Sequence, residues 1–238
     1  MSVHGSAPDR RRRFYKAVEV TQADDGWSPT LDGRTPRSPQ GQPLVLPTET
    51  LARLAAAEWD AQDPEINPDT MPVTRLAWAA LSLGASDAAD RIAEYAGSDL
   101  LCYFAERPAS LVARQQAEWG PLLEWAETAL GVDFRRAVGV QHIAQRADTI
   151  AAVRATVAAE EPFALTGLVV ATALFGSAIL ALALRRARID GAGAYALSRL
   201  DESFQEERWG VDAEAAARAA RILAEAEVLE RWFKGLAG

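Results

Sequence analysis

The chain has 238 residues and a formal net charge of −8, with 49% hydrophobic and 24% charged residues. This balance is typical of a folded protein of one or two domains and excludes a disordered chain, while the acidic charge disfavours a general nucleic-acid binder. One cysteine, Cys102, and two histidines, His4 and His142, exclude an intrachain disulfide, a cysteine metal cluster and a multi-histidine metal site.

The chain begins with a polar segment that contains four consecutive arginines at residues 10–13. It lacks the apolar core of a secretory signal, so we do not expect export. We predict that residues 1–12 form a disordered basic arm. Contact of this arm with a nucleic acid or a lipid is the alternative.

Residues 13–47 are predicted to form a small β-rich domain of three or four strands. Aromatic and β-branched residues alternate over residues 14–20, and an Asp-Asp-Gly turn signal separates them from a second candidate strand at residues 27–31. A short apolar run at residues 44–46 lies between two prolines, as in an edge strand. Such a layer is marginally stable by itself and needs a partner to pack against.

Residues 48–238 are predicted to form a larger, all-helical domain. Thr48 is a plausible N-cap for the first helix, and Pro121 is expected to interrupt or restart a later one. Residues 134–143 fit a strand or a loop equally well, and residues 214–233 are predicted to form the last helix. The fold class is therefore α+β, with a β-rich N-terminal domain followed by a helical one.

Residues 163–184 carry no charge and are long enough to cross a bilayer. The amphipathic, charged segments around them are typical of a soluble body, in which a helix that is apolar on all sides lies at the centre of a bundle. The pattern favours a central buried helix, and a membrane-associated adaptor remains the alternative.

A search for catalytic motifs yields little. Residues 191–196 match a dinucleotide-binding fingerprint, but an apolar helix precedes them where that motif needs a strand. Cys102 lies in an apolar run and is expected to be buried and inert, and His142 has no identifiable catalytic partner. We therefore expect no cofactor and no metal.

An acidic cluster near the C-terminus is the strongest candidate site. Helical spacing places Glu202, Gln205 and Trp209 on one face, with Asp201 and Glu206 beside them. The cluster fits a solvated acidic face whose Trp209 anchors the helix against the core, a carboxylate metal site, or acid–base catalysis. It equally fits a surface that binds another protein.

Several motifs occur in an order that resembles a known family. They are Arg13-Phe14-Tyr15-Lys16, Leu31-Asp32-Gly33-Arg34, Glu58-Trp59-Asp60-Ala61-Gln62, Met71-Pro72-Val73-Thr74-Arg75-Leu76, the stretch from Gln115 to Trp119, and Ser198-Arg199-Leu200-Asp201-Glu202 with Gln205 and Trp209-Gly210. Together they cover about residues 13–235 and resemble the assembly chaperones of the F-type ATP synthase that act on its α subunit.

The resemblance implies a chaperone that binds free α subunit transiently, prevents its aggregation and yields it to the β subunit. It implies a protein that is not an enzyme, uses no cofactor, binds no nucleic acid, inserts stably in no membrane and acts as a monomer. The partner-binding residues it implies are Asp201, Glu202, Gln205, Glu206 and Trp209. The expected location is the bacterial cytoplasm, or the mitochondrial matrix for a eukaryotic source. A small-molecule enzyme built on the cluster around Glu202 is the alternative.

Overall fold

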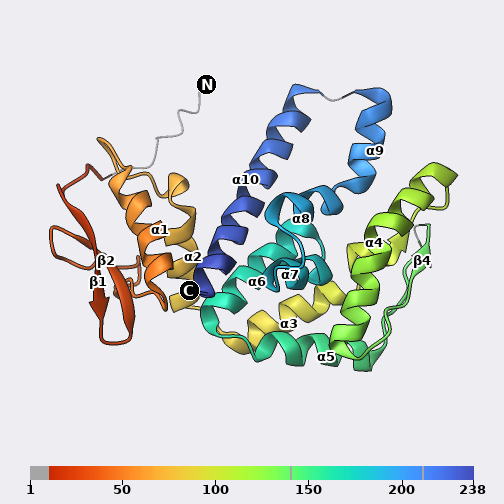
Figure 1. Ribbon diagram of the computed structural model, residues 1–238, viewed down its shortest axis with the longest axis horizontal. Helices are drawn as coiled ribbons and strands as arrows, with labels where there is room; N and C mark the ends of the chain where they lie inside the picture. Colours follow the sequence, from red (N-terminus) through yellow and green to blue (C-terminus); the bar gives the residue numbers. More distant parts are fainter. Residues whose placement is uncertain (1–10, 140, 211) are drawn as a thin grey trace, which may run out of the picture. The chain divides into compact units, whose positions relative to one another are not determined.

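The computed structural model describes residues 11–139, 141–210 and 212–238. Its contacts divide the chain into two compact units, which are residues 11–81 of the described chain and Ser82–Ala237 (Figure 1). The contacts thus group two helices with the β layer, whereas the sequence-based division placed every residue after 47 in the helical domain. The predicted arm lies largely outside the described residues. Of its last two residues, Arg11 accepts a hydrogen bond from the backbone of Ile66.

The first unit combines a β-hairpin with helices, as the predicted α+β class requires. Its elements are β1 (Val18–Ala23), β2 (Gly26–Leu31), α1 (Glu49–Asp60), the 3₁₀ helix η1 (Pro68–Thr70) and α2 (Pro72–Leu81). The strands are antiparallel and pair Val18 with Leu31 at one end and Ala23 with Gly26 at the turn. The Asp-Gly signal therefore marks the hairpin turn as predicted.

The β layer is smaller than the sequence pattern indicated. The apolar run at residues 44–46 adds no further strand and forms only an isolated bridge, from Leu46 to Trp27. Its prolines remove the backbone donors that a longer ladder would need. Leu44 and Leu46 are nevertheless fully buried, so this segment contributes to the core of the first unit.

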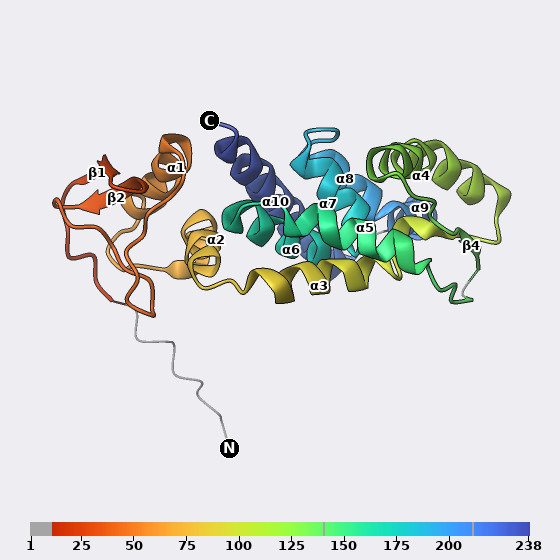
Figure 2. The same cartoon turned by 90° about the horizontal axis from the view of Figure 1, so that it is seen from below.

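The second unit is helical apart from one short parallel pair of strands. Its elements are α3 (Ala85–Ala96), η2 (Leu100–Cys102), β3 (Tyr103–Phe104), α4 (Ala109–Leu130), β4 (Ala137–Val138), α5 (Ala147–Ala158), α6 (Pro162–Phe175), α7 (Ala178–Arg185), α8 (Gly191–Ser198), α9 (Leu200–Trp209) and α10 (Ala213–Leu236). Figure 2 shows α3 and α5 side by side beneath the central helices. Pro121 lies inside α4 and does not end it. Among the described residues of the undecided segment 134–143, only the two residues of β4 are in a strand.

The apolar segment at residues 163–184 is buried at the centre of this unit, but it forms two helices. Gly176 ends α6 in the left-handed conformation, with φ at +64°, and Ser177 then caps α7 through a hydrogen bond from Leu180. Ala178 to Leu184 are all buried. Within the described residues no helix is long and apolar enough to cross a membrane.

A buried carboxylate holds the break between the two helices. Asp99 is completely buried and accepts hydrogen bonds from the Ser177 hydroxyl at 2.7 Å, from the Ile179 amide at 3.1 Å and from the Leu101 amide at 3.1 Å. Burial raises its pKa to about 6 despite these donors. Asp99 thereby orders the start of α7 and the turn that leads into η2.

Candidate functional site

Contacts with α4 position the acidic helix α9 and the turn before it. The fully buried Gln115 accepts a hydrogen bond from the Ala105 amide at 2.7 Å and donates one to Asp201 Oδ1 at 2.7 Å. Trp119, also buried, donates its indole Nε1–H to the carbonyl of Leu197 at 3.0 Å. The polar residues of this α4 motif therefore fix the start of α9.

Two of the five predicted site residues make contacts within the protein. Asp201 is half-buried, and burial raises its pKa although the hydrogen bond from Gln115 opposes the shift. Glu206 forms an ion pair with Arg199 at 2.6 Å. Asp201 thus holds α9 against α4, and Glu206 ties it to Arg199 at the junction with α8.

The other three predicted site residues face solvent. Glu202 and Gln205 are exposed, and within the described chain no hydrogen bond or ion pair engages either side chain. Trp209 is 79% exposed. The interpretation in which Trp209 anchors α9 against the core is therefore wrong.

A hollow of about 860 Å³ lies beside this face. Glu202 and Glu206 line it from α9, and Asp212, Glu214 and Arg218 line it from the start of α10. Leu174, Phe175 and Ile222 supply apolar walls, and Arg199 is the second cation. Acids outnumber cations four to two along the lining, so the hollow favours a basic, partly apolar ligand.

Sequence reasoning did not connect the start of α10 with the acidic cluster. Asp212 caps α10 by accepting a hydrogen bond from Ala215, and Glu214 lies in its first turn. Acids at these positions are expected from helix capping alone. Only the tertiary structure brings them to the hollow that Glu202 and Glu206 also line.

The remaining chemical candidates have structural explanations. Gly191 begins α8, and a Cβ there would lie 2.6 Å from the carbonyl oxygen of Ala226, so the glycine permits close packing on α10. Cys102 is buried, which raises its thiol pKa. His142 Nδ1 lies 3.1 Å from the Tyr103 hydroxyl. No group of three or more potential metal-ligating side chains occurs in the part of the chain that the structure describes.

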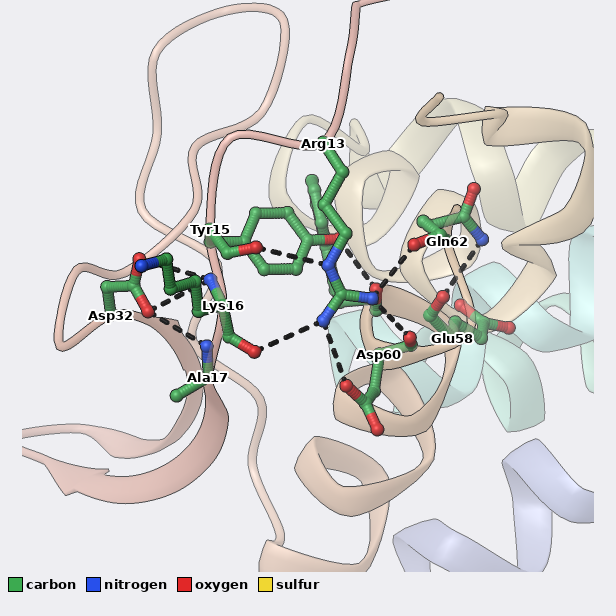
Figure 3. A network of polar contacts seen from close by, with 9 residues as sticks. Arg13, Tyr15, Lys16, Ala17, Asp32, Glu58, Asp60 and Gln62 are labelled. Atoms are coloured by element: carbon green, nitrogen blue, oxygen red, sulfur yellow. Dashed lines mark hydrogen bonds and ion pairs between the residues drawn. The ribbon is translucent and has the colours of Figure 1, made fainter. Parts of the chain in front are cut away.

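The motifs of the first unit form a polar network (Figure 3). The Arg13 guanidinium donates to the carbonyls of Asp60 at 2.5 Å and Gln62 at 2.8 Å and to Asp60 Oδ1 at 3.1 Å. The Tyr15 hydroxyl donates to the carbonyl of Trp59 at 2.6 Å. These contacts tie the segment before β1 to the C-terminal end of α1.

The same network sets the path from α1 to α2. Glu58 accepts from the amides of Val73 at 2.7 Å and Thr74 at 2.8 Å, at the N-terminus of α2 where amides lack helical partners. Gln62 accepts from the Asn67 amide at 2.7 Å and donates to the Thr70 hydroxyl at 3.1 Å. These motif residues therefore build the scaffold of the first unit.

Comparisons with known proteins agree with this architecture. A family model described as ATP12 chaperone protein matches residues 12–127. The crystal structure of Atp12 from Paracoccus denitrificans is 43% identical and covers 95% of this chain and 98% of its own, with a TM-score of 0.89, and a mutant of that protein gives the same values. A protein of Agrobacterium tumefaciens is 40% identical over 94% of this chain and 86% of its own, with a TM-score of 0.88.

The similarity extends to a mitochondrial protein of a eukaryote. The mitochondrial protein atp12 of Schizosaccharomyces pombe is 24% identical over 214 residues, which cover 84% of this chain and 74% of that protein. Identity and coverage this high among the solved structures identify the family directly. The chain therefore belongs to the ATP12 chaperone family, and the predictions of an ATP synthase assembly chaperone and of a protein that is not an enzyme are confirmed.

Proposed function

We propose that this chaperone binds the free α subunit of the F-type ATP synthase through the exposed face of α9. We call this face the α9 surface; it consists of Asp201, Glu202, Gln205, Glu206 and Trp209. The bound α subunit is protected from aggregation and is released when the β subunit arrives. The single observation that carries this assignment is the 79% exposure of Trp209 beside the exposed Glu202 and Gln205.

An exposed tryptophan next to uncompensated polar groups suits a transient interface. Tryptophan is enriched among the residues that dominate binding energy, because its ring buries a large area at small conformational cost. Glu202 adds a charge that steers a partner with a basic patch. A polar rim of this kind binds less permanently than an obligate apolar interface does, so the β subunit can displace it.

The two engaged acids have a positioning role in this proposal. Asp201 reaches α4 through Gln115, and Glu206 pairs with Arg199. Both contacts fix the orientation of α9 before the partner arrives, which reduces the entropy lost on binding. Glu202, Gln205 and Trp209 then make the direct contacts.

We further propose that the protein works as a monomer in the cytoplasm of a bacterium. Solved structures at 43% and 40% identity come from two bacterial species. The curated relative from fission yeast is mitochondrial. A role in the assembly of the same enzyme fits either compartment, and the higher identity favours the bacterial one.

Co-expression with the α subunit of the same organism, followed by size-exclusion chromatography, tests the proposal. We expect a co-eluting complex that dissociates when β subunit is added. Glu202→Lys should abolish co-elution without changing the thermal unfolding of the chaperone, because its side chain is exposed and forms no hydrogen bond or ion pair with the described residues. Glu94→Lys is the matched control, since Glu94 is an exposed glutamate of α3 that does not line the hollow beside α9.

Two results would contradict the assignment. If the wild-type chain leaves the elution of soluble α subunit unchanged, the proposed partner is wrong. If Glu202→Lys and Glu94→Lys both retain the complex, the partner stands and the α9 surface is not the binding site.

A further inference from the structure

The first unit contains a second hollow, of about 800 Å³, that the α9 surface does not explain. Its residues come from the segment before β1, from the loop after β2 and from α1, η1 and α2. The aromatic side chains of Phe14, Trp59 and Trp78 line it together with Leu31 and Ile66. This volume lies in the range of sites that bury a ligand or a short peptide.

Trp59, one of the residues that line this hollow, carries a buried hydrogen-bond donor without an acceptor. Trp59 is only 6% exposed, and its indole Nε1 finds no hydrogen-bond partner in the described chain. An unsatisfied buried donor destabilises a folded protein. Trp59 is therefore held at the wall of the hollow at a cost to stability.

Phe14 gives the hollow an exposed apolar rim. Its side chain is 69% exposed, although its ring contacts Tyr15 edge-on at a centroid distance of 5.3 Å. The fixed backbone on both sides, through Arg13 and Tyr15, holds the ring at this place. A large apolar side chain held at the edge of a hollow is a ready contact for a partner.

The walls and charges of the hollow narrow the class of ligand. The hollow is also lined by three prolines, Pro36, Pro39 and Pro68. Aromatic-lined grooves bind extended, proline-containing peptides. Three arginines line the hollow against one acid, Asp69. This local excess of positive charge occurs in a chain whose net charge is −8, so it selects for carboxylates.

We propose that this hollow is a second docking site, which takes an extended peptide segment of a partner protein. The segment places a proline or aliphatic side chain against Phe14 and Trp59. An Asp or Glu side chain of the segment meets Arg34 and Arg37. The site is independent of the α9 surface and of the partner that binds there.

Panning the full chain against a phage-displayed library of random dodecapeptides tests this assignment. We expect enrichment of peptides that combine Asp or Glu with proline or aliphatic residues. The enriched peptides, made synthetically, should shift the indole resonance of Trp59 in the full chain labelled with ¹⁵N-tryptophan. Loss of that resonance in Trp59→Phe assigns it.

Variants separate the hollow from nonspecific charge. Phe14→Ala and the double variant Arg34→Glu, Arg37→Glu should each weaken the peptides by about tenfold or more. Arg75→Glu is the matched control, because Arg75 is exposed in the same unit and does not line the hollow. Glu202→Lys should bind the peptides as the wild type does, which separates this site from the proposed function.

Several outcomes would overturn the proposal. They are enrichment of basic peptides, equal affinity of the double variant, and peptide binding without movement of the Trp59 resonance. Displacement of the peptides by ATP would assign the hollow to a nucleotide. Self-association of the chain that Phe14→Ala abolishes would assign it to a second copy.

Discussion

Two polar clusters of this protein contain the same kinds of residue and differ in how their polar atoms are paired. In the first unit, the side chains of Arg13, Glu58 and Gln62 each reach two or more partners within the chain. On the α9 surface, Glu202 and Gln205 reach none among the described residues. Polar groups that are already hydrogen-bonded within the protein have little capacity to bond a partner. Polar groups that are exposed to water keep that capacity.

The same difference distinguishes two roles of a tryptophan that lies near acidic residues in the sequence. Trp59 is buried at 6% exposure and stacks edge-on with Tyr15 and Trp78. Trp209, which the sequence places in similar company, is 79% exposed. The first ring stabilises the scaffold, and the second leaves most of its area exposed for contact with another protein.

The largest effect on stability is expected where a paired polar group is completely buried. Asp99→Ala removes the acceptor of the Ser177 hydroxyl and of the Ile179 and Leu101 amides. Leaving these buried donors unpaired should lower the free energy of unfolding by about 4 kcal/mol. Urea unfolding followed by circular dichroism measures it. Asp87→Ala, at an exposed position of α3, is the control and should change stability by less than about 0.5 kcal/mol.

The titration of Asp99 should make the stability of the protein depend on pH. Its pKa in the folded protein is raised to about 6, so the folded state binds the proton more tightly than the unfolded state. Its contribution to stability is therefore complete below about pH 4 and is lost as the pH rises through 6, by up to about 3 kcal/mol.

Comparing the wild type with Asp99→Asn isolates this contribution, because the effects of all other titrating groups are the same in both proteins and cancel. The difference in unfolding free energy between wild type and variant should be larger at pH 4 than at pH 7. A difference that stays constant from pH 4 to pH 7 would show that Asp99 does not titrate in this range.

A smaller loss of stability is expected in the first unit. Arg13→Ala removes the donors to the carbonyls of Asp60 and Gln62 and the contact over the Tyr15 ring. We expect a decrease of about 2 kcal/mol in the free energy of unfolding, measured by urea titration. Arg53→Ala, which removes an exposed pair with Glu49 within α1, should change it by less than about 0.5 kcal/mol. Equal effects of the two variants would contradict the structural role of the Arg13 network.

The smallest change in stability is expected on the α9 surface. Trp209→Ser should leave the free energy of unfolding within about 0.5 kcal/mol of the wild type, because the side chain is exposed. It should nevertheless weaken the α-subunit complex by about tenfold or more, as measured by a pull-down titration. If the variant unfolds instead, Trp209 stabilises the fold as Trp59 does.

The sequence by itself determined the elements whose signals are local. The Asp-Gly turn, the Thr48 cap and the apolar run at residues 163–184 predicted the hairpin, the first helix and the buried centre, because turn chemistry, capping and hydrophobicity act over a few residues. Helical spacing also grouped Glu202, Gln205 and Trp209 on one face.

Only the tertiary structure decided how those elements end, pair and become exposed. Asp99, far along the chain from Ser177, joins the cap where the apolar segment breaks into two helices. Pro121 stays inside α4, whose Trp119 and Leu123 are buried, because packing outweighs the single hydrogen bond that proline removes. The exposure of Trp209 and the link from Gln115 to Asp201 depend likewise on contacts between residues distant in sequence, which no local pattern encodes.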